Sequence, residues 1–196
     1  MKNDKTIQKI SEESCTGCAA CYNKCPVDAI SMKYNAEGFQ FPSIDEDICI
    51  TCGACLNVCP VENPVQFYTT PPAYAVWAAD DVRLKSSSGG MFSLLADYII
   101  EQGGAVCGAV YSSDFRFVYH DWAENKENLS PLRGSKYIQS EIRYTYRQAE
   151  NFLKSGRKVL YTGCPCQIAG LYKFLGKNYP NLYTADLVCH GANSLT

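Results

Sequence analysis

CTGCAACYNKCP, residues 15–26, and CITCGACLNVCP, residues 49–60, follow one formula, C-x2-C-x2-C-x3-C-P. Each cysteine of the second stretch lies at the same offset from its counterpart in the first, so the two stretches are an internal duplication. Together they contain eight of the chain's twelve cysteines. The N-terminal third of the chain is therefore organised around its thiols.

The spacing within each stretch predicts an iron–sulfur cluster. Three thiolates three residues apart can hold three corners of a cubane cluster, and the fourth cysteine of such a motif serves the other cluster. One predicted 4Fe-4S cluster is thus bound by Cys15, Cys18, Cys21 and Cys59. The other is bound by Cys49, Cys52, Cys55 and Cys25. Small residues within the loops, such as Gly17, allow backbone amides to approach the sulfurs.

Zinc is the alternative, because soft thiolates also select zinc. Zinc sites usually place their second ligand pair a dozen or more residues from the first, which differs from this spacing. Residues 5 to 64 instead resemble a bacterial two-cluster ferredoxin. That resemblance implies a compact fold with short hairpins around two cluster loops.

Composition limits the remaining choices. The chain has 196 residues, 46% of them hydrophobic, and a net charge of -2 with both signs interspersed, so we expect a globular protein that does not bind nucleic acid. No apolar run reaches the ~18 residues that a membrane span needs, and the N-terminus lacks a signal-peptide pattern. We therefore expect a cytoplasmic protein, in which many cysteines indicate metal binding or redox chemistry.

The chain after Pro60 divides into a linker and a second unit. Residues 61–74 contain Pro64, Pro71 and Pro72 without a clear period, so we place a domain boundary between residues 67 and 68. Beyond it, segments typical of strands (73–79, 105–111, 115–120, 158–162 and 182–188) alternate with segments typical of helices (91–102, 141–155 and 168–175). The predicted fold class is α+β: a small two-cluster ferredoxin-like domain, 1–67, followed by an α/β unit with a largely parallel sheet, 68–196.

Three loops are predicted to follow the carboxyl ends of strands, where open α/β sheets bind ligands. They are SSSGG at 86–90, GCPCQ at 163–167 and CHG at 189–191. The first also precedes a predicted helix, whose free amides favour an anion such as phosphate, although serine is an ordinary helix cap as well.

Four ordered motifs carry a further resemblance: SSGGMFSLLADYI, LRGSKYIQS, LYTGCPCQIAGL and DLVCHG. They are similar to motifs of the coenzyme F420 hydrogenase/dehydrogenase beta-subunit family, so the second unit is expected to be a partial flavin-binding domain. The resemblance implies bound FAD, a redox partner protein, and a small-molecule or deazaflavin substrate. The residues that it implies for the flavin pocket are Ser87, Ser88, Gly89, Gly90, Ser135, Lys136, Tyr137, Pro165, Gln167 and Gly191. Family members extend well past CHG, so we expect the chain to be incomplete at its C-terminus.

The remaining cysteines leave alternatives open. Cys164 and Cys166 could form a strained disulfide, join Cys189 and His190 around zinc or a third cluster, line the flavin pocket, or simply pack in a tight turn. In the pocket interpretation Cys166 is the catalytic thiol, Gln167 offers its amide to the flavin, and His190 is a candidate proton donor. Lys136 would lie beside the flavin, or else be a solvated surface lysine. Cys107 is expected to be a buried strand residue.

Two functions follow from these patterns. The first is an iron–sulfur flavoprotein oxidoreductase, in which a flavin converts a two-electron step into single electrons carried by the clusters. The alternative is a ferredoxin-type electron-transfer protein with no substrate of its own. Flavin binding distinguishes the two functions.

Overall fold

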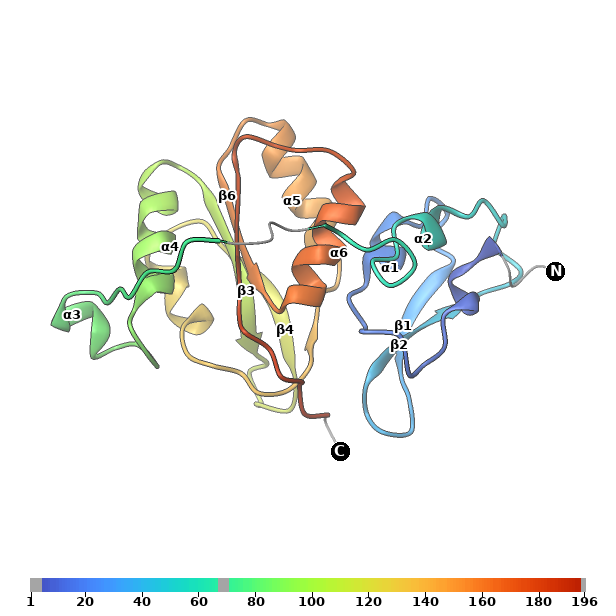
Figure 1. Cartoon of the computed structure of the whole chain (residues 1–196), viewed down its shortest axis with the longest axis horizontal. Coiled ribbons are helices and arrows are strands. Elements are labelled where there is room, and N and C mark those ends of the chain that lie inside the picture. The colour runs from blue at the N-terminus through green and yellow to red at the C-terminus, as the bar shows by residue number, and fades with distance from the viewer. Residues whose placement is uncertain (1–4, 67–70, 195–196) are drawn as a thin grey trace.

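The computed structural model describes residues 5–66 and 71–194, and the predicted domain boundary at 67/68 lies outside these residues. Figure 1 shows a small N-terminal unit packed beside a larger layered unit. Among the described residues, no helix is long and apolar enough to cross a membrane.

The N-terminal unit is built from short elements around one hairpin. These elements are η2 (Ile7–Lys9), α1 (Ala20–Lys24), β1 (Ile30–Tyr34), β2 (Gln40–Ile44) and α2 (Ala54–Asn57). Strands β1 and β2 pair antiparallel, from Ile30 opposite Ile44 to Tyr34 opposite Gln40. Helices α1 and α2 each begin inside one cysteine stretch, so the duplication in sequence is also a duplication in structure.

The larger unit contains a five-stranded mixed sheet with the order β5-β4-β3-β6-β7. Strand β3 pairs antiparallel with β4, whereas β3–β6, β6–β7 and β4–β5 are parallel. The elements of this unit are α3 (Asp80–Arg83), α4 (Met91–Glu101), β3 (Ala105–Tyr111), β4 (Val118–Ala123), η3 (Glu127–Leu132), β5 (Ser140–Glu141), α5 (Thr145–Lys154), β6 (Val159–Gly163), α6 (Pro165–Leu175) and β7 (Leu182–Asp186). The α+β class and the largely parallel sheet agree with the sequence prediction.

Side chains along the central strands point alternately to the two faces of the sheet, and each face is covered by an apolar layer. On β3 and β6, Val106 and Leu160 pack with α4 and η3, while Cys107 and Tyr161 point to the opposite face, toward α5 and α6. The second layer does not end at α6, because its core continues into the N-terminal unit through Cys18, Ala19, Ala20 and Val58. The two units therefore share one hydrophobic core.

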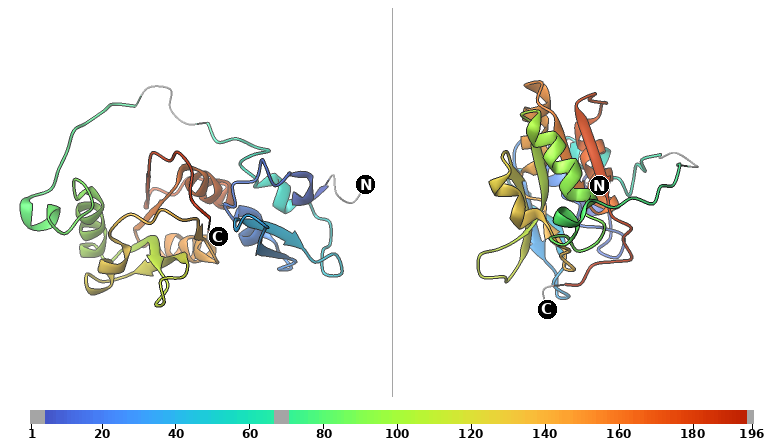
Figure 2. Two further views of the ribbon diagram at one scale, coloured as in Figure 1. Left: turned by 90° about the horizontal axis from the view of Figure 1, so that it is seen from below. Right: turned by 90° about the vertical axis from the view of Figure 1, so that its left-hand side faces the viewer.

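Two strand predictions require correction. Residues 73–79, expected to be a strand, form no strand, and Figure 2 shows this segment standing off the larger unit on its way to α3. Tyr74 and Trp77 are 81% and 68% exposed, so its alternating apolar side chains have no sheet to cover. The SSSGG loop consequently follows the short helix α3 and not a strand.

The second correction concerns the strand predicted at 115–120. A turn closed by the Ser112 amide on the Phe117 carbonyl, at 2.9 Å, occupies its first half. Phe115 in that turn has φ 57°, a left-handed conformation incompatible with a strand. Strand β4 therefore begins at Val118.

Candidate functional site

The structure brings the eight motif cysteines into two groups. One hollow, with an empty volume of about 300 Å³ that includes space open to solvent, is lined by Cys15, Cys18, Cys21 and Cys59. A second hollow of about 320 Å³ is lined by Cys49, Cys52, Cys55 and Cys25. Each group combines three cysteines of one stretch with the last cysteine of the other. We call them the first and second cysteine hollows.

The backbone around the two hollows follows one pattern. The second residue after the first cysteine has a positive φ in both stretches, 66° at Gly17 and 55° at Thr51. The fourth residue does too, 58° at Ala19 and 77° at Gly53, and each caps the short helix that follows. A left-handed conformation costs a non-glycine residue on the order of 1 kcal/mol. The strain at Ala19 and Thr51 shows that the loop conformation is imposed by its surroundings.

The thiols of the first hollow are held in apolar surroundings with few hydrogen bonds. Burial raises the pKa of the Cys18 thiol to about 12 and raises the pKa of Cys21 well above its usual range. In the first hollow the Gly17 amide donates to Cys15 Sγ at 3.5 Å, and in the second hollow the Ala29 amide donates to Cys25 Sγ at 3.2 Å. Grouped soft thiolates with amide donors and a surrounding apolar wall are a donor set that suits iron–sulfur clusters.

The first hollow is fixed by the larger unit. The Tyr146 hydroxyl lies 2.9 Å from the Cys18 carbonyl oxygen and 2.7 Å from the carbonyl oxygen of Gln167 on α6. Gly170, one turn farther along α6, leaves so little room that an added Cβ would lie 3.2 Å from Cys18 Sγ. Helix α6 thus forms an outer wall for the first cysteine loop.

The second hollow is tied to the larger unit through Arg147 on α5. Its guanidinium donates to the carbonyl oxygens of Asn23, at 2.6 Å, and Cys25, at 3.0 Å. It also pairs with the Asp28 carboxylate at 2.6 Å. One side chain therefore fixes both ends of the segment that carries Cys25.

The residues predicted for a flavin pocket fall along one edge of the larger unit. Ser135 in the GSKY motif donates its amide to Ser87 Oγ at 3.3 Å, which joins that motif to SSGG. Gly90 begins α4 without a side-chain cap, and Arg133 Nε donates to Ser93 Oγ in the first turn of this helix at 3.0 Å. Uncapped helix amides beside a guanidinium fit an anionic group such as a phosphate.

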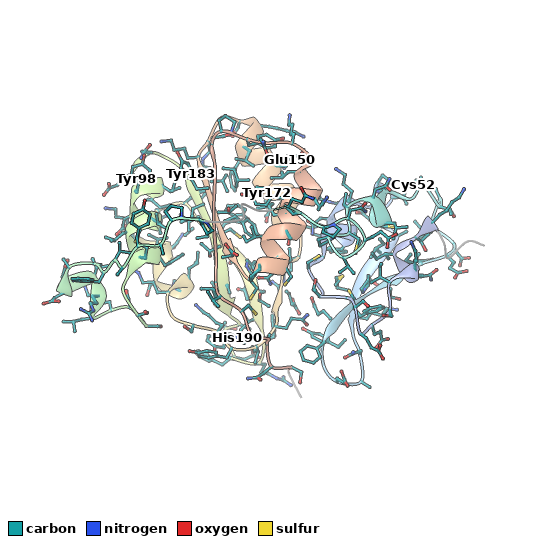
Figure 3. All side chains as sticks on the ribbon, viewed as in Figure 1. Cys52, Tyr98, Glu150, Tyr172, Tyr183 and His190 are labelled. Atoms are coloured by element: carbon teal, nitrogen blue, oxygen red, sulfur yellow. The ribbon has the colours of Figure 1, made fainter. Side chains whose placement is uncertain are left out.

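Tyr137 connects this edge to the CHG loop. Its carbonyl oxygen accepts from the Asn193 amide at 3.0 Å, and the Gln139 amide donates to the Asn193 carbonyl at 3.0 Å. One parallel bridge, between Ile138 and Asn193, therefore joins the segments that follow the GSKY and CHG motifs. The Tyr137 side chain is exposed, as are Pro165, His190 and Gly191. Figure 3 shows His190 near the C-terminus, on a different unit from Cys52.

Two of the predicted flavin contacts make bonds within the protein instead. Lys136 Nζ donates to the carbonyl oxygens of Pro131 and Arg133, each at 2.8 Å, and burial lowers its pKa to about 8. Gln167 is buried, accepts from the Cys164 amide at 2.8 Å and donates to Ser140 Oγ at 2.9 Å. Its amide stabilises the turn into α6.

The cysteines outside the two hollows are Cys107, Cys164, Cys166 and Cys189. Cys107 is buried within β3, as the sequence predicts. The other three lie together where β6 and β7 end. Within the ranges 5–66 and 71–194, no three cysteine, histidine or acidic side chains are arranged to hold a single metal ion.

Three residues that structure the site were not predicted: Tyr146, Arg147 and His120. Tyr146 and Arg147 lie on an amphipathic helix, where a tyrosine or an arginine is too common to signal a contact with a distant loop. His120 is buried in β4, with Nε2 3.0 Å from the Thr162 carbonyl oxygen. Its position within an apolar strand segment is a weak signal of a buried histidine.

Comparison with known proteins gives three results. Residues 14–63 match the family described as 4Fe-4S dicluster domain. No curated protein matches the sequence. A solved structure described as a xenon derivative of the F420-reducing [NiFe] hydrogenase complex from Methanosarcina barkeri is similar at 22% identity with a TM-score of 0.48.

The structural similarity covers 61% of this chain and 44% of the other, so this chain spans less than half of that relative. At this level of similarity the comparison carries no conclusion about the family or function of this chain. Residues 14–63 are similar to 4Fe-4S dicluster domains, which are iron–sulfur electron-transfer domains. The prediction of a ferredoxin-like N-terminal domain is confirmed.

Proposed function

We propose that this chain is an oxidoreductase that passes electrons between two 4Fe-4S clusters, a flavin and a second substrate. The clusters would be held by the crossed cysteine groups of the two hollows. The observation that carries the proposal is the contact between the two units. The Tyr146 hydroxyl lies 2.9 Å from the carbonyl oxygen of Cys18 in the first hollow and 2.7 Å from the carbonyl oxygen of Gln167 in the GCPCQ motif. The first hollow thus borders the edge that carries the predicted flavin motifs.

The chain's own residues have three roles in this proposal. The hollows bury five of the eight thiols, Cys18, Cys21, Cys25, Cys55 and Cys59, and burial together with amide hydrogen bonds sets the reduction potential of a cluster. The start of α4, with Ser87 and Arg133, offers donors for the phosphates of a flavin nucleotide. A bound flavin supplies the exchange between one-electron and two-electron chemistry.

The second candidate is an electron carrier with no substrate of its own. It is favoured by the internal hydrogen bonds of Lys136 and Gln167, which occupy two groups expected to face a flavin. The two candidates differ in whether the chain retains flavin. Both require the clusters.

Anaerobic reconstitution followed by iron, sulfide and flavin quantification tests the proposal. We expect about eight irons per chain from two 4Fe-4S clusters, with one flavin. Ser87→Ala should weaken flavin retention by removing the acceptor of the Ser135 amide, whereas Ser155→Ala, at the exposed end of α5, should leave it unchanged. Eight irons without flavin in the unaltered chain would favour the electron carrier.

The crossed ligand groups are tested by a pair of variants. Cys25→Ser should damage the cluster of Cys49, Cys52 and Cys55 and leave the other intact in electron paramagnetic resonance spectra. Cys59→Ser should do the reverse, because it lines the first hollow. If each variant damages the cluster of its own stretch, the crossed assignment is wrong.

A further inference from the structure

Three thiols outside the cysteine hollows meet at the carboxyl edge of the sheet. Strands β6 and β7 run parallel, with Gly163 opposite Asp186, and the Leu187 amide donates to the Gly163 carbonyl oxygen at 3.1 Å. Cys164 directly follows β6, and Cys189 lies in the loop after β7. The two thiols are close enough that the charge of Cys189 adds to burial in raising the pKa of Cys164.

The two thiols of this pair differ in access. Cys189 is exposed, and its Sγ accepts from the Gly191 amide at 3.4 Å. Cys164 is half-buried at the start of α6, where the Gln167 side chain holds its amide. One sulfur can therefore be reached by a molecule in solution, while the other is fixed behind it.

The third thiol, Cys166, lies between this pair and the first cysteine hollow. It precedes Gln167, whose carbonyl oxygen is joined to that of Cys18 through the Tyr146 hydroxyl, and it is close enough to Cys15 and Cys18 to interact with both electrostatically. The pair is thereby adjacent to the thiols proposed to bind the first cluster. Cys166 is an unsuitable disulfide partner for Cys164, because a bridge between residues two apart in sequence would be strained.

We propose that Cys164 and Cys189 are a redox-active thiol pair that closes to a disulfide and exchanges two electrons with the two 4Fe-4S clusters. On closing, both S–H bonds break, one S–S bond forms, two protons leave to solvent, and each oxidised cluster takes one electron. On opening, each reduced cluster returns one electron and two protons are taken up. The inference rests on the clusters of the proposed function.

The class of substrate that fits such a pair is a disulfide. The exposed Cys189 thiolate would attack one sulfur of the substrate and release the other as a thiol, leaving a mixed disulfide. Cys164 then attacks Cys189 Sγ, which releases the second substrate thiol and closes the protein disulfide. The net change is one substrate disulfide plus two electrons and two protons to two thiols.

Thiol mapping on the full chain tests whether the pair forms. The reconstituted protein is mildly oxidised, its free thiols are blocked with N-ethylmaleimide, disulfides are opened with a phosphine, and newly freed thiols receive a second label. Peptide mass spectrometry should find the second label on Cys164 and Cys189 together, and not on Cys107. If Cys164 and Cys189 both carry N-ethylmaleimide after oxidation, the two thiols were free and the proposal is wrong.

An anaerobic reductive titration tests whether the pair exchanges electrons with the clusters. The oxidised chain, reconstituted with iron and sulfide and without flavin, should take up about four electrons, one for each cluster and two for the disulfide. Cys189→Ser and Cys164→Ser should each take up about two, with unchanged cluster spectra. Cys107→Ala, which alters a cysteine outside the pair, should still take up four.

The outcomes separate the two proposals. If Cys166→Ser, and not Cys164→Ser, removes the two electrons, the assigned partner of Cys189 is wrong. If Cys189→Ser takes up as many electrons as the unaltered chain, the pair does not exchange electrons with the clusters. Failure of the chain to incorporate iron would count against the proposed function, whereas the label pattern would still decide whether the pair forms.

Discussion

At the scale of single residues, His120 makes the stability of the protein depend on pH. Burial lowers its pKa to about 4, and the positive charge of Lys136 acts in the same direction. Nε2 donates to Thr162, Nδ1 has no hydrogen-bond partner among the described residues, and the Tyr161 ring stacks at 5.7 Å. The folded chain therefore holds this imidazole neutral.

The unfolded chain binds a proton at His120 with a pKa near 6.5, so between this value and 4 it binds more protons than the folded chain. Stability is retained above pH 6.5 and falls as the pH drops toward 4. We expect this residue to remove about 2 kcal/mol of unfolding free energy between pH 7 and pH 5.

Urea unfolding of His120→Gln at both pH values measures this contribution. Gln can still donate to Thr162, and it does not titrate, so the variant should lose less stability on acidification than the unaltered chain. His190→Gln makes the same substitution at an exposed histidine and controls for acid damage elsewhere. Equal losses in the unaltered chain and His120→Gln would contradict the prediction.

At the scale of elements, helix α6 controls the first cysteine hollow through a glycine. A Cβ at Gly170 would lie 3.0 Å from the Tyr146 hydroxyl oxygen and 3.2 Å from Cys18 Sγ. Gly170→Ala should therefore push α6 and the Cys18 loop apart. We expect a loss of about 1–3 kcal/mol of unfolding free energy, typical of overpacking, and an altered resonance spectrum of the first cluster alone.

Gly176→Ala is the matched control because it changes a glycine at the end of the same helix. Nothing lies within 4 Å of its added Cβ, although its φ of +66° imposes a backbone cost of about 1 kcal/mol. It should lower stability without altering either cluster. A spectrum unchanged by Gly170→Ala would show that α6 does not constrain Cys18.

The elements also show what sequence can predict. The three cysteines that each stretch contributes to its own hollow were predictable because their spacing is local, whereas the exchange of Cys25 and Cys59 between the stretches follows from the known behaviour of this motif. Strand β3 spans the predicted residues because a buried strand has a clear apolar run. The strand predicted at 73–79 was wrong because strand propensity does not supply a pairing partner. The bonds of Tyr146 and Arg147 join residues more than a hundred positions apart, and no local pattern encodes such contacts.

At the scale of the whole molecule, Arg147 is the main polar connection between the units. Its guanidinium group donates hydrogen bonds to the Asn23 and Cys25 carbonyl oxygens and to the Asp28 carboxylate. A lysine ammonium cannot reproduce this geometry. Arg147→Lys should cost roughly 1–3 kcal/mol of unfolding free energy. It should also speed loss of the second cluster to a chelator, measured by the decay of its absorbance.

Arg157→Lys provides the comparison. Arg157 likewise donates to two backbone carbonyls, those of Gly103 and Gly104 at 3.0 Å, but it does so entirely within the larger unit. It should lower stability by a similar amount and leave the rate of cluster loss unchanged. Equal rates for the two variants would place the control of the second cluster elsewhere.

The core that runs from Cys18 into α5 and α6 has a consequence for the life of the protein in the cell. Clusters that bind the folded chain would stabilise it, so a chain made while iron is scarce would unfold more often and would expose apolar surface on both units at once. Proteases act on such exposed chains, so turnover of the whole polypeptide should follow iron supply. The abundance of this protein would then report the iron status of its host.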